Sequence, residues 1–191
     1  MSKILLIDNY DSFTFNLYHY LEEVVNEPIV VLRNDEITED VANEFDKIVI
    51  SPGPGLPKTA GNLMSFLDNL EENKKVLGIC LGQQAIAELF GMKLMNLGKV
   101  VHGQKSKVKV VDSSEALFQG LPEQFYVGRY HSWVIDPKSV TDDFKVTSIV
   151  DDETIMSISH KKLSIKAVQF HPESILTEYG KQMLSNWVSI G

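Results

Sequence analysis

Residues 75–91 have the sequence Lys-Val-Leu-Gly-Ile-Cys-Leu-Gly-Gln-Gln-Ala-Ile-Ala-Glu-Leu-Phe-Gly, and this stretch decides the fold. Its first five residues are mostly apolar, which is typical of a strand that is buried on both faces. The stretch continues as a helix with apolar residues at Ile86, Leu89 and Phe90, and Gly91 is a stop signal. A buried strand followed directly by a helix is the repeating unit of an α/β protein with a parallel sheet.

Two glycines, Gly78 and Gly82, bracket Cys80 where this strand meets the helix. The spacing is that of a nucleophile elbow, Gly-x-Ser-x-Gly, with sulfur in place of the serine oxygen. We expect a Cβ at either glycine to collide with the neighbouring strand or helix. Cys80 would then stand at a helix N-terminus, where unpaired N–H groups favour a thiolate and the N–H of Leu81 points to a developing oxyanion. A lone cysteine is more often a small buried residue, so this interpretation needs a partner elsewhere in the chain.

Size and composition limit the possible functions. The chain has 191 residues, of which 43% are hydrophobic and 23% charged, and its formal net charge is −8. The length suits a single domain over residues 1–191. The acidic balance argues against nucleic acid or an anionic membrane as a partner. One cysteine excludes an internal disulfide and fits a reducing compartment, and no apolar run reaches transmembrane length. We therefore expect a cytoplasmic protein.

Strand-like and helix-like segments alternate along the first half of the chain. Apolar strands are expected at residues 3–8, 28–32, 46–51 and 75–79, and helical segments at 12–25, 38–44, 60–70 and 80–90. This order predicts an α/β fold with an open, mostly parallel central sheet and helices on both faces. Ligands of such sheets bind at the carboxyl ends of the strands, where Asp8, Ser51 and Cys80 should meet.

The pattern changes after Gly91. Strands are expected at residues 106–111, 125–131, 144–150, 154–159 and 164–170, and a last helix at 177–188. Polar and apolar residues alternate in this half, which therefore favours a mixed or antiparallel, β-rich C-terminal part of the same domain.

The loop Ser51-Pro-Gly-Pro-Gly55 follows the third expected strand. It lacks the glycine spacing of a dinucleotide-binding or phosphate-binding loop, and its prolines remove backbone donors that a phosphate would need. We interpret it as a rigid hook, in which the N–H of Gly53 could reach a bound carbonyl beside Leu81. An ordinary Pro-Gly turn is the alternative.

A histidine far downstream provides the partner that Cys80 needs. Pro172 pushes His171 away from helical geometry, and in an extended segment His171 and Glu173 would project to the same side. Glu173 could then orient the imidazole and stabilise its charge. A cysteine, a histidine base and a carboxylate follow the logic of a catalytic triad. His19, His102 and His160 have no such neighbours in sequence and are interpreted as ordinary surface or core residues.

Five motifs resemble those of class I, triad-type glutamine amidotransferases and follow one another in the order of that family. They are Asp8-Asn-Tyr-Asp-Ser-Phe-Thr14, Ser51-Pro-Gly-Pro-Gly55, Gly78-Ile-Cys-Leu-Gly-Gln-Gln84, Tyr130-His-Ser132 and Gln169-Phe-His-Pro-Glu173. The chain most resembles the glutaminase subunits of anthranilate synthase and 4-amino-4-deoxychorismate synthase. The resemblance implies that the chain hydrolyses L-glutamine to glutamate and ammonia through a cysteine thioester.

The resemblance also implies roles for individual residues. Cys80 would be the nucleophile, His171 the base and acid, and Glu173 its partner, with Gly53 and Leu81 as the oxyanion hole. The residues that would bind glutamine are Gly53, Pro54, Gly55, Gln84, Ser132 and Trp133. At Trp133 relatives more often carry leucine, which matters little if only the backbone binds the substrate.

The resemblance names a partner, the chorismate-using large subunit of a synthase. Free ammonia in neutral water is mostly protonated, so direct transfer to such a subunit would preserve its reactivity. We expect the anthranilate synthase of tryptophan biosynthesis, with the 4-amino-4-deoxychorismate synthase of folate biosynthesis, or service to both, as the alternative. Another cysteine hydrolase, such as a peptidase or a γ-glutamyl hydrolase, and a non-catalytic module are the competing interpretations. No cofactor and no metal are expected on this chain.

Overall fold

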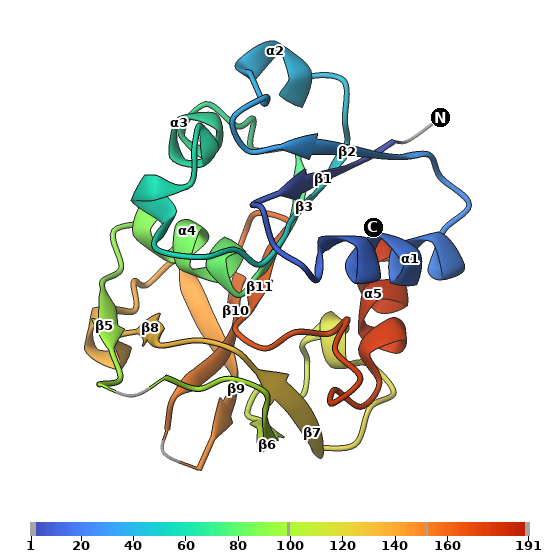
Figure 1. Ribbon diagram of the computed structural model, residues 1–191. Helices are drawn as coiled ribbons and strands as arrows, with labels where there is room; N and C mark the ends of the chain where they lie inside the picture. Colours follow the sequence, from blue (N-terminus) through green and yellow to red (C-terminus); the bar gives the residue numbers. More distant parts are fainter. Residues whose placement is uncertain (1–2, 99, 152, 190–191) are drawn as a thin grey trace.

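The structure is a computed structural model that describes residues 3–98, 100–151 and 153–189 (Figure 1). One nine-stranded sheet runs through it in the spatial order β2-β1-β3-β4-β11-β10-β9-β6-β7. The first five of these strands pair in parallel: β2 (Ile29–Arg33), β1 (Ile4–Asp8), β3 (Lys47–Ile50), β4 (Lys75–Ile79) and β11 (Ile165–Val168). The last four pair antiparallel: β10 (Ile155–His160), β9 (Phe144–Val150), β6 (Gln104–Val110) and β7 (Gln124–Arg129).

Helices cover both faces of the parallel part. One face carries α1 (Thr14–Val24) and α5 (Gly180–Ser189), and the other carries α2 (Glu39–Ala42), α3 (Leu63–Asp68) and α4 (Leu81–Leu89) (Figure 1). Successive residues of β1 alternate between the two cores: Leu5 and Ile7 pack with the α3 and α4 side, and Ile4 and Leu6 with the α1 and α5 side. A strand buried on both faces must be apolar throughout, which explains the uninterrupted apolar runs. The predicted fold class is confirmed.

The register of the parallel strands brings three loops to one edge. Ile50 pairs with Gly78, and Ile79 pairs with Val168, so the residues that follow β3, β4 and β11 leave the sheet side by side. The N–H of Cys80 donates to the carbonyl of Val168 at 2.8 Å, which ties the start of α4 to the end of β11. Although β11 belongs to the C-terminal half of the chain, it completes the parallel part of the sheet.

Some elements differ from the sequence prediction. The helix expected at residues 60–70 spans only Leu63–Asp68, because Ala60 and Gly61 are in a turn and Gly61 has a positive φ of 54°. A two-stranded antiparallel ribbon of β5 (Leu94–Asn96) and β8 (Trp133–Ile135) was not predicted, since three residues are too few to show alternation. No helix in the described part of the chain is long and apolar enough to cross a membrane.

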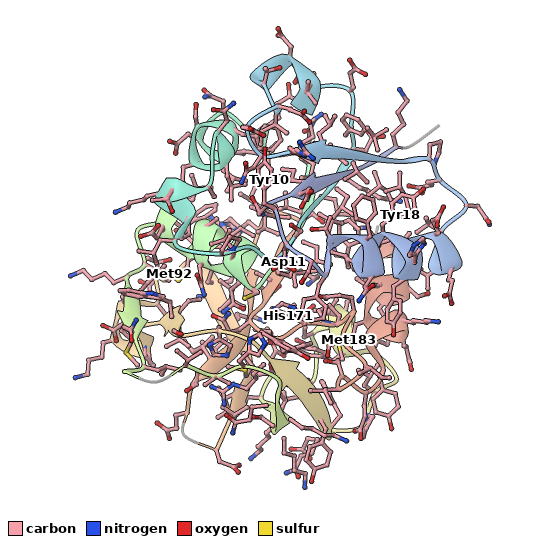
Figure 2. The ribbon with its side chains drawn as sticks, in the orientation of Figure 1. Tyr10, Asp11, Tyr18, Met92, His171 and Met183 are labelled. Atoms are coloured by element: carbon pink, nitrogen blue, oxygen red, sulfur yellow. The ribbon has the colours of Figure 1, made fainter. Side chains whose placement is uncertain are left out.

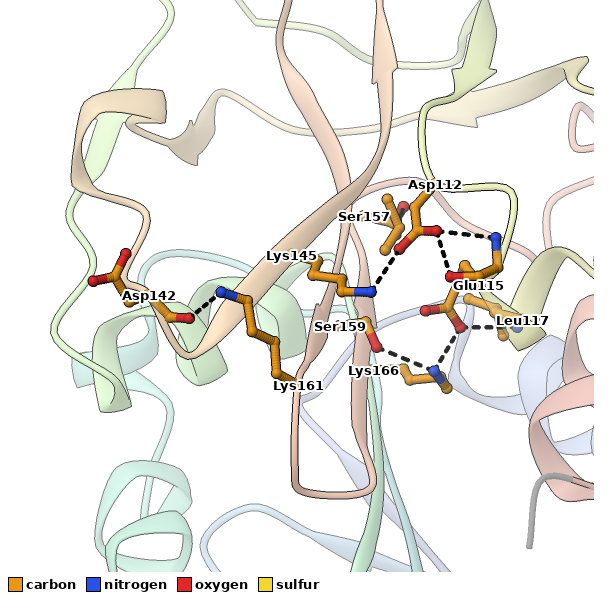
Figure 3. Close-up of polar contacts among 11 residues, drawn as sticks. Asp112, Glu115, Leu117, Asp142, Lys145, Ser157, Ser159, Lys161 and Lys166 are labelled. Carbon is orange, nitrogen blue, oxygen red and sulfur yellow. Dashed lines mark hydrogen bonds and ion pairs between the residues drawn. The ribbon is translucent and has the colours of Figure 1, made fainter.

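A polar network fixes the loop before β7 to the neighbouring strands β11 and β10 (Figure 3). Lys166 Nζ of β11 lies 2.6 Å from Glu115 Oε1 and donates to Ser159 Oγ at 3.1 Å. The same Glu115 oxygen accepts the N–H of Leu117 at 2.9 Å, so one carboxylate caps a short 3₁₀ turn and pairs with a lysine. Both charged side chains are largely buried, with 14% and 4% of their surface exposed.

Candidate active site

Cys80 occupies a strained turn between β4 and α4. Its backbone has φ 53° and ψ −100°, a region that non-glycine residues seldom adopt. A Cβ on Gly78 would lie 2.6 Å from the Gly82 backbone, and one on Gly82 would lie 2.7 Å from the Ile50 carbonyl oxygen. The two glycines therefore allow α4 to fold back onto its own strand and onto β3, as the sequence predicted. The structure places the cysteine at the first turn of a helix.

The Gly53 loop is packed directly against this turn. A Cβ on Gly53 would lie 2.5 Å from Asn9 Cβ and 2.6 Å from Leu81 Cδ2, so only glycine fits here. Asn9 anchors the loop with two hydrogen bonds, from its N–H to Ser51 Oγ at 3.0 Å and from its Nδ2 to the Ser51 carbonyl at 2.9 Å. Asn34 Nδ2 donates to Asn9 Oδ1 at 3.0 Å. The motif that contains Asn9 does not reveal this anchoring role, because the contact depends on Ser51, 42 residues away.

His171 and Glu173 are in contact, but not through an extended segment. His171 Nδ1 and Glu173 Oε1 are 2.7 Å apart, and both side chains are almost completely buried. The backbone makes a turn, in which the N–H of Ser174 donates to the His171 carbonyl at 3.1 Å. The prediction of an extended segment was wrong, because Pro172 takes the second position of this turn, for which its fixed φ is suited.

Several contacts hold the His171 turn in place. The N–H of His171 donates to the Gly128 carbonyl at 3.1 Å, and Thr177 Oγ1 donates to the His171 carbonyl at 2.6 Å. Thr177 Oγ1 also accepts the N–H of Gly128 at 2.9 Å. A Cβ on Gly180 would overlap the Pro172 carbonyl oxygen, so the first residue of α5 packs tightly on the turn.

Aromatic side chains enclose the imidazole. The His171 ring centroid lies 4.8 Å from that of Tyr130 and 5.3 Å from that of Phe13, and Tyr130 and Phe13 are 5.0 Å apart. Tyr130 Oη makes a hydrogen bond of 3.1 Å with Ser174 Oγ. Figure 2 shows His171 near the middle of the molecule, below the loop that carries Asp11 and above β6 and β7. Sequence reasoning missed Phe13 in this position.

The electrostatics of the site favour a charged imidazole. Burial lowers the pKa of His171, but the neighbouring Cys80 sulfur and the Glu173 carboxylate outweigh burial, and the pKa lies well above the usual value for histidine. Nδ1 contacts Glu173, while Nε2 is buried without a hydrogen bond of good geometry in the described part of the chain. The ring nitrogen that faces away from Glu173 is therefore available for proton transfer.

A pocket of about 280 Å³ opens onto Cys80. Its lining contains Cys80 and all the residues expected to bind glutamine: Gly53, Pro54, Gly55, Gln84, Ser132 and Trp133. Val100, Val101, His102, Tyr130 and His131 complete the lining. Leu81, His171 and Glu173 lie outside this lining. A larger pocket, of about 660 Å³, is formed by residues 110–123 and shares no residue with the predicted site.

A chain of side-chain contacts connects residues of this pocket lining through Gln169, which lies outside the lining. Gln84 Nε2 donates to the Trp133 carbonyl at 3.0 Å and to Gln169 Oε1 at 3.4 Å. Gln169 Nε2 donates to Cys80 Sγ at 3.5 Å. The sequence does not predict this role for Gln169, because the contact joins residues 89 positions apart. In the described part of the chain, no group of three or more His, Cys, Asp or Glu residues is arranged to hold a metal ion.

Comparison with known proteins decides the family. The model of the family described as glutamine amidotransferase class-I matches residues 5–190. The chain belongs to the class-I glutamine amidotransferases. It is therefore a glutamine amidotransferase enzyme, and the resemblance stated from its motifs is confirmed.

Relatives of this amidotransferase align with nearly all of it. The chain is 44% identical over 187 residues to "Aminodeoxychorismate synthase component 2" of Escherichia coli, covering 97% of the chain and 98% of the relative. It is 43% identical over 187 residues to "Anthranilate synthase component 2" of Lactococcus lactis, covering 97% and 93%. Among solved structures, a "putative gmp synthase subunit a protein" of Thermoplasma acidophilum superimposes with a TM-score of 0.87 at 30% identity, covering 98% and 92%.

Proposed function

We propose that Cys80 is the nucleophile in the hydrolysis of glutamine. The observation that carries this proposal is the strained elbow that presents Cys80 to the small pocket, next to an imidazole whose pKa is raised by the sulfur and by Glu173. A raised pKa on His171 means that the imidazole is protonated near neutral pH, so a cation and proton donor lies beside the sulfur. The thiolate is the form of cysteine that attacks a carbonyl.

The reaction proceeds in two halves. The Cys80 sulfur forms a bond to the side-chain amide carbon of glutamine, and the carbonyl electron pair moves to oxygen. The N–H groups of Gly53 and Leu81 stabilise this oxyanion, with each donor contributing roughly 10²–10³ in rate. His171 then donates its proton to the amide nitrogen, the C–N bond breaks, and ammonia leaves.

The second half removes the γ-glutamyl group. His171, now neutral, takes a proton from water, and the resulting hydroxide attacks the thioester carbon. The C–S bond breaks and glutamate departs, which restores the thiolate and the imidazolium. Glu173, at 2.7 Å from Nδ1, keeps Nε2 directed at the reacting atoms and stabilises the ring charge.

The small pocket favours glutamine over larger substrates. At about 280 Å³ it lies just below the usual volume of sites for drug-sized ligands, which fits a single amino acid. Gln84 and the backbone at Ser132 and Trp133 would hold the amino-acid end of glutamine. Gly53, Pro54 and Gly55 would lie beside its reacting amide.

The ammonia is delivered to a chorismate-using synthase subunit that covers the pocket. The names of the relatives, each a second component of a synthase, support this proposal. Apolar side chains at two places in the fold also support it: Val100, which lines the pocket, is 79% exposed, and Ile175, two residues after Glu173, is 95% exposed. Contiguous exposed apolar surface marks sites that a partner covers, and the proposed partner would cover both side chains. The proposed partner is the large subunit of anthranilate synthase, and the 44% identity to the aminodeoxychorismate component supports the second candidate.

Reconstitution tests the proposal. The chain is mixed separately with the large subunits of anthranilate synthase and aminodeoxychorismate synthase, and glutamate release and the aromatic product are measured with chorismate present. We expect weak glutaminase activity alone, stimulation by the correct subunit, and anthranilate as the product. Cys80→Ala should abolish product formation from glutamine but preserve it from added ammonium. Loss of both activities in Cys80→Ala, or full glutaminase activity without any subunit, would contradict the proposal.

The same assay separates the competing interpretations. A γ-glutamyl hydrolase or peptidase would cleave γ-glutamyl peptides or peptide amides faster than glutamine. A non-catalytic module would release no glutamate and would not react at Cys80 with an electrophilic glutamine analogue.

A further inference from the structure

We propose that Gln169 is a positioning residue that donates a hydrogen bond to Cys80 Sγ and thereby couples the nucleophile to the lining of the glutamine pocket. This inference rests on the proposed role of Cys80. The main evidence is the contact of 3.5 Å between Gln169 Nε2 and Cys80 Sγ, which joins residues 89 positions apart in the chain.

The orientation of the Gln169 amide is fixed by its neighbours. The Trp133 carbonyl can only accept, so Gln84 must present its NH₂ group at 3.0 Å. That NH₂ group can only donate, so Gln169 must turn its Oε1 toward Gln84 at 3.4 Å. The NH₂ group of Gln169 is then directed at sulfur, and a thiolate can only accept. The Gln84 NH₂ group therefore donates to both the Trp133 carbonyl and Gln169, and the NH₂ group of Gln169 donates onward to Cys80.

The surroundings of Gln169 make this hydrogen bond more than a surface contact. The side chain is completely buried, and Gln84 is only 3% exposed. The N–H of Gln169 donates to the Met156 carbonyl at 2.8 Å, which fixes its backbone to β10. The residue before it, Val168, accepts the N–H of Cys80 at 2.8 Å. The end of β11 therefore holds both the backbone and the sulfur of Cys80.

The hydrogen bond has two consequences for the reaction. In a buried site, a donor to sulfur stabilises the thiolate over the thiol, in addition to the effect of His171. It also restricts the sulfur to one side of the elbow. Because Gln84 is the proposed contact for the amino-acid end of glutamine, the same chain of amides connects substrate binding to the position of the nucleophile.

The pH profile of Cys80 alkylation by iodoacetamide, without glutamine, tests the inference. Gln169→Met keeps a long unbranched side chain but removes the donor, and Gln169→Glu keeps the shape but places a carboxylate at the thiolate. A hydrogen bond to a charged group predicts that the midpoint of alkylation rises by about one pH unit in Gln169→Met, and we expect a larger rise in Gln169→Glu. Gln182→Glu makes the same change from amide to carboxylate at an exposed side chain, and it should leave the pH profile of alkylation unaltered.

Activity measurements separate positioning from simple packing. We expect kcat for glutamine hydrolysis to fall in Gln169→Met, and the loss to shrink as the pH is raised above the shifted midpoint, because the missing thiolate is then restored. A packing defect would lower kcat equally at all pH values. Thermal unfolding of each variant shows whether it is folded. If Gln169→Met does not fold, Gln169→Asn replaces it, because the shorter amide cannot reach the sulfur.

The alkylation experiment separates failure of this inference from failure of the proposed function. An alkylation midpoint that stays at the wild-type value in both folded variants would overturn the inference. Absence of a γ-glutamyl thioester in the wild-type enzyme would instead overturn the proposed function, even if the alkylation midpoint moved as expected.

Discussion

The strain at Cys80 predicts an unusual order of stability for two variants. Replacing cysteine by alanine or by glycine removes the thiol in both cases, so the two proteins differ only in the Cβ. In ordinary backbone conformations glycine is the less stable choice by about 0.5–1 kcal/mol, because the unfolded chain gains freedom. At φ 53° and ψ −100° a Cβ costs about 1–3 kcal/mol of strain. We therefore expect Cys80→Gly to be more stable than Cys80→Ala by about 1 kcal/mol.

Urea and thermal unfolding measure this difference. For a chain of this length, 1 kcal/mol corresponds to a shift of about 2–4 °C in Tm. Ala87→Gly is the matched control, because Ala87 is buried in α4 with ordinary helical geometry. It should lose about 1–2 kcal/mol from helix propensity and the buried methyl group. If Cys80→Gly were less stable than Cys80→Ala by an amount similar to the control, the elbow would not store strain and the reasoning would be refuted.

Three further predictions concern the catalytic pair, two ion pairs and the pKa of Lys75. His171→Ala should lower kcat for glutamine hydrolysis more than Glu173→Ala, because transferring a proton is a larger task than orienting the group that transfers it; the reverse order in steady-state assays would contradict the assigned roles. Glu115→Ala leaves a largely buried lysine unpaired and should cost about 3 kcal/mol in urea unfolding. Asp112 Oδ2 lies 3.3 Å from Lys145 Nζ in a more exposed pair, so Asp112→Ala should cost less than about 1 kcal/mol, and equal losses would count against the burial argument. Burial, together with nearby lysines, lowers the pKa of Lys75 from 10.5 to about 8. Between these values the unfolded chain binds more protons than the folded one, so the stability contributed by this site rises with pH from about 8 to 10.5. Lys75→Met should remove that rise, so that the free energy of unfolding of the wild type increases relative to that of the variant between about pH 8 and 10.5. The same dependence of the unfolding free energy on pH in both proteins would show that the pKa of Lys75 is not lowered.

Local sterics were predictable from the sequence. The requirement for glycine at positions 78 and 82 follows from the strand–turn–helix pattern, and the structure places the backbone of Gly82 and the carbonyl of Ile50 where a Cβ would have to be. The alternation of strands and helices likewise predicted the parallel part of the sheet. These features depend on neighbours in the chain, where a pattern in the sequence is informative.

Contacts between distant segments were predictable only in part. The pairing of His171 with Glu173 was predicted, but through an extended segment rather than a turn that is held by Gly128 and Thr177. The contact between Gln169 and Cys80 arises because β11 enters the sheet next to β4, which no local pattern reveals. Such positions become visible only when the strand order is known.

The covalent intermediate is the most direct test of the whole account. The wild-type enzyme, in complex with the synthase subunit that activates it, is quenched in acid during turnover of glutamine, digested and examined by mass spectrometry. The account predicts one γ-glutamyl group on the peptide that contains Cys80, with accumulation of this adduct when the second half of the reaction is slowed. Glutamate release at the wild-type rate by Cys80→Ala, or a glutamyl group on any other residue, would contradict it.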